Sequence, residues 1–275
     1  MADSNRRDAL RALAATVALS YASRGTSLLA GGKVEAARKP IKVGQVGVGH
    51  AHAGKLSVFR ESPDYEVVGV VEPDASLRQK AEARAVYRGL PWMTQEQLLN
   101  TPELELVLVE TRVRDLLGAA ETCIDAGKHV HLDKPAGSSL PRYRHILEKA
   151  DRQQLLVQMG YMYRYNPGVV LLREVLERGW LGVPFEVHAV MSKVVQPDSR
   201  RQLAEYRGGI MFELGCHLID LVVDVLGPPD KVTPYARQTG REDTLVDNML
   251  AVFEYPQATA TVKSSALEVE GFARR

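Results

Sequence analysis

The sequence predicts an α/β fold: a parallel sheet with helices on both faces, followed by an α+β domain with an open, mostly antiparallel sheet. From residue 40 to residue 160, short β-branched runs alternate with helical stretches, and the connections are short. This alternation is typical of βαβ units, because parallel neighbours need a crossover connection that is usually a helix. After residue 160, several strand-like runs follow one another directly, which indicates antiparallel pairing.

The first domain is expected to cover residues 40–160. Turn-forming residues mark the ends of its helices: Ser62-Pro63-Asp64 follows the first helix, and Gly127 follows the third, where glycine commonly ends a helix. The expected strands cover residues 41–46, 65–71, 105–110, 128–132 and 155–159. The expected helices cover residues 51–60, 75–85, 116–126 and 139–152.

The second domain is expected to cover residues 161–275. Its expected helices and strands are helices 167–178 and 210–226, and strands 183–195, 231–238, 245–255 and 259–266. The last strand is followed almost at once by the end of the chain, which leaves a sheet edge unpaired, and proteins normally cover such edges. We therefore expect this domain to be incomplete at its C-terminal end.

The bulk composition argues against several classes of protein. The chain has 35 basic and 34 acidic residues and a net charge of +1, without the basic excess of nucleic-acid-binding proteins. Its two cysteines, Cys123 and Cys216, are too few for a disulfide scaffold and lack zinc-site spacing. No apolar run approaches the ~20 residues that span a bilayer. We expect neither a nucleic-acid partner nor a membrane span.

The first 35 residues are expected to be a leader outside the fold. Arg6-Arg7 precedes a short, weakly apolar stretch, as in a twin-arginine export signal. Ala9 stands where a large apolar residue is usual, so a loosely helical leader on a cytoplasmic protein is the alternative. We expect export to the periplasm.

The segment after the first expected strand carries the most informative motif. Gly47-Val48-Gly49 lies between that strand and the following helix, where the chain must turn sharply and a Cβ would block a pyrophosphate. The helix N-terminus supplies free N–H groups for the phosphates. His52 occupies the third position of G-x-G-x-x-G, which is normally small. The motif predicts a Rossmann-type dinucleotide-binding domain.

Glu72 ends the second expected strand, 23 residues after Gly49. An acidic side chain at this place hydrogen-bonds the ribose hydroxyls of the cofactor, and its charge repels a 2′-phosphate. The sequence therefore favours NAD over NADP. The alternative is that Glu72 only caps the helix that follows Pro73.

Three further segments resemble the Gfo/Idh/MocA oxidoreductase family. One ends in Asp133-Lys134-Pro135, where the family has Glu-Lys-Pro. The segment from Gly208 to Asp220 resembles the family's GG-x3-D-x-G-x-H-x2-D helix, with Glu213 in place of the first Asp. The segment from Gly160 to Pro167 resembles the family's exit from the cofactor domain.

The resemblance implies an activity and a set of site residues. The activity is NAD(P)-dependent transfer of hydride between a nicotinamide and a hydroxyl or carbonyl group of a sugar, cyclitol or related polyol. The second domain is implied to hold the substrate, and its sheet often joins copies into a homo-oligomer. The implied cofactor-binding residues are Gly47, Gly49, His50, Glu72, Thr111, Asp133 and Lys134. The family's usual Thr-Pro-Asn reads Thr111-Arg112-Val113 here.

Three residues are the candidate catalytic groups. Lys134 suits a developing alkoxide, because an ammonium group lowers the pKa of a neighbouring hydroxyl. His217 is the preferred proton acceptor, since imidazole changes charge near neutral pH. Glu213 lies four residues earlier on the same helix and shares a face with His217. The alternatives are a surface lysine and an exposed Glu–His pair.

Four more residues are candidate substrate contacts: Tyr161, Arg164, Asn166 and Asp220. Packing at a helix entry explains the aromatic side chain equally well. The pairs His50/His52 and His129/His131 could each offer two ring nitrogens to a metal ion, but a site needs further convergent ligands. We expect no metal.

Fold alone does not decide the function. The main alternative is a non-catalytic NAD-binding or sugar-sensing protein on the same fold, favoured by Glu213, by the altered segment Thr111-Arg112-Val113 and by the short C-terminus. A glycoside hydrolase that uses NAD as an internal redox relay is a third candidate.

Overall fold

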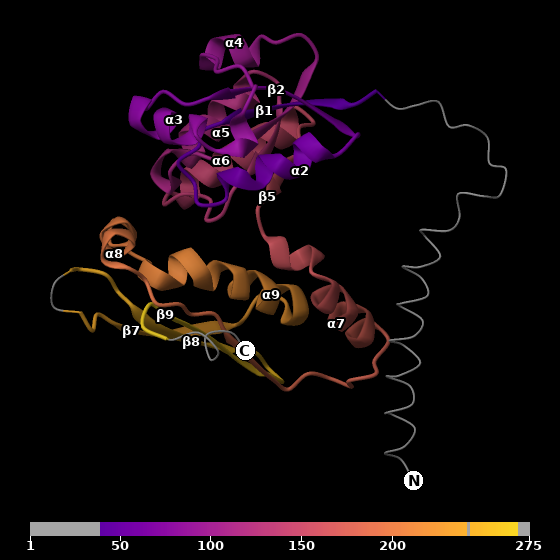
Figure 1. The fold of residues 1–275 in the computed structure, drawn as a ribbon. Coiled ribbons are helices and arrows are strands. Elements are labelled where there is room, and N and C mark those ends of the chain that lie inside the picture. Colours follow the sequence, from indigo (N-terminus) through magenta and orange to yellow (C-terminus); the bar gives the residue numbers. More distant parts are fainter. Residues whose placement is uncertain (1–38, 241–242, 269–275) are drawn as a thin grey trace. The chain divides into compact units, whose positions relative to one another are not determined.

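The computed structural model describes residues 39–240 and 243–268, which form two sheets with their helices (Figure 1). The expected leader at residues 1–35 and the chain end after residue 268 lie outside the described residues. Among the helices of the described part, none is both long and apolar enough to cross a membrane.

The first sheet has five parallel strands in the order β2-β1-β3-β4-β5. A parallel bridge from Val70 to Trp92 adds a further segment beside β2. β1 lies between β2 and β3, so the strand order reverses at β1. Open α/β sheets bind ligands at the carboxyl ends of the strands at such a reversal. The strands are β1 (Ile41–Val46), β2 (Tyr65–Val71), β3 (Leu104–Val109), β4 (His129–Leu132) and β5 (Val157–Met159).

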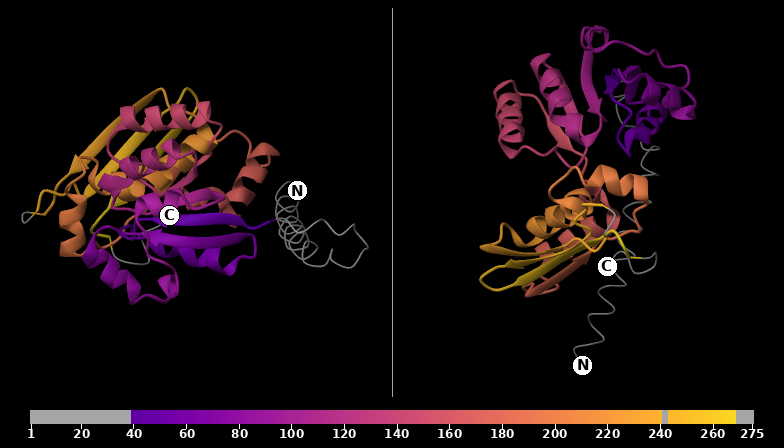
Figure 2. Two further views of the ribbon diagram at one scale, coloured as in Figure 1. Left: turned by 90° about the horizontal axis from the view of Figure 1, so that it is seen from above. Right: turned by 90° about the vertical axis from the view of Figure 1, so that its left-hand side faces the viewer.

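Helices cover both faces of this sheet (Figure 2, right). Buried side chains form one apolar cluster with α5 and α6 and another with α2 and α3, so each face has its own core. Cys123 on α5 lies in the first cluster, as expected for a buried thiol. The helices are α2 (Leu56–Glu61), α3 (Ala75–Glu82), α4 (Gln95–Leu99), α5 (Leu116–Asp125) and α6 (Leu140–Arg152).

The first helix begins later than the sequence predicted. A 3₁₀ turn, η2 (Ala53–Lys55), precedes α2. Residues 47–52 before this turn, which contain the predicted phosphate-binding motif and are called the phosphate loop below, are not helical. His52 explains the delay, because its large ring stands where a small residue normally lets the helix pack closely against the sheet. The expected helix 75–85 likewise ends at Glu82, and a separate 3₁₀ turn, η3 (Ala85–Tyr87), follows.

The second sheet has four strands in the order β6-β9-β8-β7. The pairs β7/β8 and β8/β9 are antiparallel and β6/β9 is parallel, which confirms an open, mostly antiparallel sheet. The expected strand 183–195 is shorter, at Glu186–Val190. The remaining elements are η5 (Met162–Tyr165), α7 (Pro167–Glu177), β6 (Glu186–Val190), α8 (Pro197–Leu203), β7 (Lys231–Arg237), β8 (Asn248–Glu254) and β9 (Thr259–Ser265).

The helix expected at 210–226 consists of two parts. It opens as one π-helical turn, η6 (Met211–Gly215), and continues as α9 (Cys216–Leu226). Leu214, Leu218 and Val222 pack with strand residues of the sheet, so α9 lies along one of its faces (Figure 1). π-Helical turns within α-helices are frequently found at functional sites, and this one contains Glu213.

Candidate active site

The loop after β1 has the conformation that a dinucleotide phosphate site needs. Gly47 has φ +89°, and a Cβ there would lie 2.6 Å from the N and Cα atoms of Thr111. The Gly47 N–H donates to Val71 O at 2.8 Å, and the His50 N–H donates to Glu110 O at 2.9 Å. The loop is therefore held between the ends of β2 and β3, and only glycine fits at its start.

Glu72 lines a cavity of about 360 Å³ beside this loop. Its two carboxylate oxygens accept the N–H groups of Val48 and Asp74, each at 2.9 Å. Thr111 lines the same cavity. Each carboxylate oxygen has a second lone pair, so Glu72 holds the loop and still has acceptor capacity for hydroxyl groups. The glycine turn and this carboxylate fit the phosphates and the ribose of NAD.

A second cavity, of about 600 Å³, continues from the first. Asp74, Leu77 and Arg112 line both cavities, and Arg112 forms an ion pair with Asp74 between them. The second cavity reaches from the phosphate loop at Gly49 to Glu213 on η6. The two cavities therefore adjoin at these residues, with Glu72 lining the first and Glu213 lining the second.

Glu213, which lines the second cavity, contacts Lys134. Lys134 follows β4 and is 2% exposed. Its Nζ donates to the backbone oxygen of Glu213 at 2.9 Å and to the Glu213 Oε1 at 3.2 Å. A buried ammonium group needs such a partner, since an unpaired charge in the interior is strongly disfavoured. The structure thus brings together two of the three candidate catalytic residues.

His217, in the first turn of α9, is also buried and lies near the charged side chain of Lys134. Its Nδ1 has no hydrogen-bond partner among the described residues, and the rings of Tyr161 and Tyr163 meet it edge-on. Burial, and to a smaller extent the charges of Lys134 and His52, lowers the pKa of His217 to about 4. The ring is therefore neutral at pH 7, with a buried nitrogen that has no partner among the described residues.

The other predicted substrate contacts have partners within the protein. Arg164 binds Asp220 through two hydrogen bonds, at 2.8 and 2.5 Å, which fixes η5 against α9. Asn166 accepts the N–H of Gly168 at 2.9 Å and caps α7. Tyr161 contacts His217 as described. Of these four residues, the structure places Tyr161 beside the catalytic candidates and gives Asn166 a structural role.

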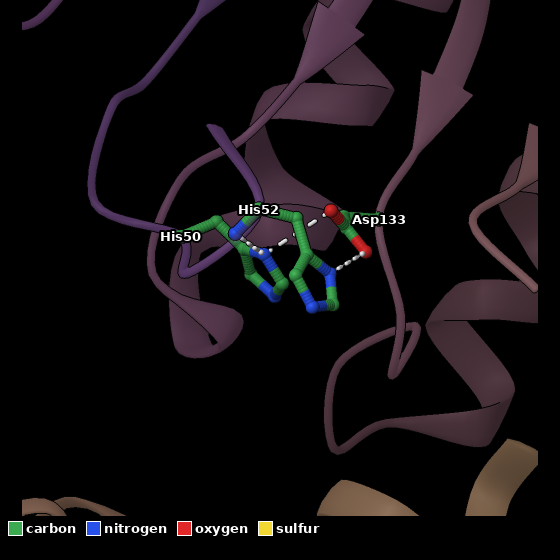
Figure 3. Close-up of side chains that lie close together, drawn as sticks. All are labelled: His50, His52 and Asp133. Atoms are coloured by element: carbon green, nitrogen blue, oxygen red, sulfur yellow. Dashed lines mark hydrogen bonds and ion pairs between the residues drawn. The ribbon is translucent and has the colours of Figure 1, made fainter. Parts of the chain in front are cut away.

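Asp133 lies next to His50 and His52, with which it forms a polar cluster (Figure 3). It is fully buried, and its two oxygens face His50 Nδ1 at 3.1 Å and His52 Nδ1 at 3.3 Å. Lys55 Nζ donates to the same carboxylate at 2.7 Å. The sequence resemblance implies that Asp133 and His50 bind the cofactor; in the structure their side chains contact each other, and the binding role stays a prediction.

Glu110 ends β3 next to this cluster and is also fully buried. Burial and the neighbouring charge of Asp133 raise the pKa of Glu110. Burial also opposes ionisation of Asp133, but hydrogen bonds from His50 and His52 outweigh it and hold the pKa of Asp133 well below its usual range. Because the two buried carboxyl groups lie next to each other, ionisation of one disfavours ionisation of the other, and this raises the pKa of Glu110.

Three cluster members could serve as metal ligands. One ligand atom each from His50, His52 and Asp133 lies within 4.8 Å of the other two, so the convergence that sequence could not establish is present. However, the Lys55 ammonium already sits 2.7 Å from the Asp133 carboxylate and supplies the positive charge there. The expectation of no metal stays a prediction.

Sequence reasoning missed Lys55, Glu110 and the role of His52. A charged residue at the end of a buried strand, as Glu110 is, was the available signal, because such a residue must have a partner inside the protein. The sequence around Lys55 offered no comparable signal, because a lysine near the start of an expected helix is common and is usually exposed to solvent. Its partner Asp133 is 78 positions away.

Two family sequence models match the chain. The model of an oxidoreductase family with an NAD-binding Rossmann fold matches residues 41–161. The model of the GFO/IDH/MocA C-terminal domain matches residues 169–274.

Curated relatives and solved structures agree with this match. Trans-1,2-dihydrobenzene-1,2-diol dehydrogenase of Bos taurus is 26% identical, over 78% of this chain and 65% of its own length. Inositol 2-dehydrogenase of Salmonella agona is 25% identical, over 78% of this chain and 63% of its own length. The chain thus spans less than two thirds of either enzyme. GenD2 from gentamicin A biosynthesis, in complex with NAD, has a TM-score of 0.76 at 22% identity, covering 85% of this chain and 68% of that one. That likeness shows the fold.

Proposed function

The chain belongs to the Gfo/Idh/MocA family of oxidoreductases, and from this premise we propose that it is an NAD-dependent dehydrogenase of a small polyhydroxylated substrate. The substrate class is a sugar, a cyclitol or a related vicinal diol. The observation that carries the proposal is the contact between Lys134 and Glu213, which lines the cavity that adjoins the one at Gly47. Similar enzymes are named for an inositol and for a dihydrodiol.

NAD, when bound, accepts the hydride that leaves the substrate carbon. The turn at Gly47 would hold its phosphates, and Glu72 would hold its adenosine ribose. The carboxylate of Glu72 disfavours the 2′-phosphate of NADP. The fit rests on the close approach of Gly47 to Thr111 and on the remaining acceptor capacity of Glu72.

Lys134 is suited to polarise the reacting hydroxyl. Its buried ammonium stabilises the negative charge that develops on oxygen when the proton leaves, and the interaction is strong because water is largely excluded. Glu213 holds the amine in place through its backbone oxygen and its carboxylate. His217, neutral and with an unpartnered Nδ1, offers a hydrogen bond that orients a substrate hydroxyl.

The test is to measure NAD⁺ binding and NADH formation with the purified full chain. Myo-inositol, glucose and trans-cyclohexane-1,2-diol form the first panel. We expect Lys134→Met to lower kcat by about 10²–10³-fold, the loss typical for removing one group that stabilises developing charge. NAD⁺ affinity should stay close to that of the wild type.

Lys128→Met is the matched control. Lys128 precedes the same strand at its opposite end, and its Nζ donates to Leu104 O at 2.9 Å, away from both cavities. This variant should keep full turnover. Turnover that survives Lys134→Met contradicts the assignment. A wild-type protein that binds NAD⁺ but oxidises nothing in a broadened polyol panel favours the non-catalytic sensor.

A further inference from the structure

The wall of the second cavity carries more lysine and arginine side chains than its carboxylates can pair with. Three carboxylate side chains line it, and each has a cationic partner. The pairs are Asp74 with Arg112, Glu205 with Arg114, and Glu213 with Lys134. Two more lysines, Lys80 and Lys193, line the same cavity, and neither has an ion-pair partner within the described part of the chain. The cavity therefore presents two ammonium groups that a bound anion can pair with.

The two lysines belong to different parts of the cavity wall. Lys80 lies on α3, three residues after Leu77, which lines both cavities, so Lys80 is on the side where NAD would lie. The pyrophosphate of NAD accounts for a cation on that side. Lys193 follows β6 of the second sheet and belongs, like Glu213, to the segment that matches the family's C-terminal domain. We therefore expect the anion that pairs with Lys193 on the substrate.

The backbone at Lys193 is fixed, although its side chain is exposed. The Lys193 N–H donates to Ser265 O at 3.0 Å, and the Val195 N–H donates to Ala266 O at 3.0 Å. The buried hydroxyl of Ser192 accepts the N–H of Ser265 at 3.0 Å. These bonds continue the pairing of β6 with β9 beyond the end of β6, so the ammonium group is carried by a rigid segment. A rigid support lowers the ordering cost of binding.

A buried ion-pair network holds α8, which follows Lys193 and lines the same cavity. Arg200 on this helix donates to Asp243 Oδ2 at 2.6 Å and to Asp247 Oδ2 at 2.7 Å, and Asp247 is fully buried. The guanidinium group is thus already paired with two carboxylates and does not serve a ligand. Ser199 and Gln202 line the cavity, and their side chains have no hydrogen-bond partner among residues 39–240 and 243–268.

We propose that Lys193, Ser199 and Gln202 form a subsite for an anionic group of the substrate, either a carboxylate or a phosphate ester. This rests on the proposed function and narrows the substrate to an acidic sugar or cyclitol derivative. A lysine ammonium is a compact charge with three donors that binds either group, and the hydroxyl and amide add uncharged donors. The cavity also reaches Glu213, the partner of Lys134. An anion held at Lys193 would therefore set which substrate hydroxyl reaches Lys134.

The first experiment compares substrates with and without the anionic group. The purified full chain with NAD⁺ is assayed on glucose, glucuronate and glucose 6-phosphate, and on myo-inositol and myo-inositol 1-phosphate. We expect kcat/KM to be at least about tenfold higher for an anionic compound than for its neutral counterpart, because a hydrogen bond to a charged group corresponds to a factor of about 10–100. The carboxylate and phosphate compounds show which anion the subsite takes.

Lys193→Met should remove this preference by raising KM for the anionic compound. Its kcat/KM for the neutral compound and its NAD⁺ affinity should stay close to those of the wild type. Lys80→Met is the matched comparison, because Lys80 is the other lysine of this cavity without an ion pair among the described residues, and this variant should keep the preference. A wild type that oxidises neutral and anionic compounds equally well overturns the inference and leaves the proposed function standing. A Lys193→Met variant that keeps the preference but loses NAD⁺ affinity also overturns it.

The second experiment needs no turnover. Brief acetylation with acetic anhydride, followed by mass spectrometry, measures how accessible each lysine amine is in the full chain with excess NAD⁺. Inorganic phosphate or glucuronate should slow the acetylation of Lys193 but not that of Lys231, an exposed lysine paired with Glu254. Equal acetylation of Lys193 with and without either anion overturns the inference. If the wild type oxidises none of the compounds, the proposed function fails, and the acetylation result still decides whether the subsite exists.

Discussion

Gly47→Ala tests the phosphate loop, because two separate penalties meet at this residue. An alanine at φ +89° costs about 1–2 kcal/mol, as left-handed backbone does for residues with a Cβ. The new Cβ would also lie 2.6 Å from the N, Cα and Cγ2 atoms of Thr111, whereas ordinary contact begins at 3.4 Å. Backbone atoms cannot rotate away, so the loop and the segment after β3 must separate, at a further ~1–3 kcal/mol.

Gly89→Ala separates the two penalties. Gly89 has φ +77°, and a Cβ there would meet no atom within 4 Å, so only the backbone cost applies. We expect Gly89→Ala to lose about 1–2 kcal/mol of unfolding free energy and to keep its NAD⁺ affinity. Gly47→Ala should lose more and bind NAD⁺ at least tenfold more weakly, as ~1.4 kcal/mol corresponds to a factor of ten. Urea unfolding and titration calorimetry measure both quantities. The reasoning would be refuted if the two variants had equal unfolding free energies and Gly47→Ala bound NAD⁺ with wild-type affinity.

Three further predictions follow from the same contacts. Glu72→Gln should weaken NAD⁺ binding about tenfold, because a hydrogen bond to a charged group contributes ~1.5–3 kcal/mol. It should also reduce the difference between the NAD⁺ and NADP⁺ affinities measured by calorimetry. An unchanged difference in affinity counts against the contact between Glu72 and the ribose. Because burial lowers the pKa of His217 from 6.5 to about 4, the unfolded ring takes up a proton between these pH values while the folded ring does not. The protein should therefore lose ~3 kcal/mol of stability as the pH falls through that window, and His217→Gln should lose correspondingly less in urea unfolding at each pH; identical pH dependence contradicts the burial argument. Residues 1–35 fused to a reporter should direct its export, and replacing both Arg6 and Arg7 by lysine should stop it; export that survives the replacement refutes a twin-arginine signal.

Most strands of the fold could be predicted because their buried runs are bounded by strong turn residues. β1 and β2 have the predicted bounds, and the helix that Gly127 closes ends within one residue of its prediction. The π-helical turn at Met211–Gly215 could not be predicted, because it depends on close packing. A Cβ on Gly215 would lie only 2.0 Å from the sulfur of Met211, a contact within the turn that sequence spacing does not reveal.

The site was predictable where one short motif carries it and not where distant segments meet. Gly47 and Glu72 are fixed by a strand, a turn and a spacing, and both line or shape the cavity expected for NAD. The contacts around Asp133 join loops that are far apart in the chain, so no local sequence pattern could predict these contacts. The capping role of Asn166 could also have been predicted, since an asparagine before a proline at a helix start is a capping signal.

The most direct test of the proposed active site is a crystal structure of the full chain with NAD⁺ bound. We predict the pyrophosphate against the N–H groups of the loop at Gly49, and the nicotinamide ring within van der Waals reach of Lys134 and His217. A nicotinamide that lies away from both side chains, with Lys134 still bound to Glu213 out of its reach, would contradict the account.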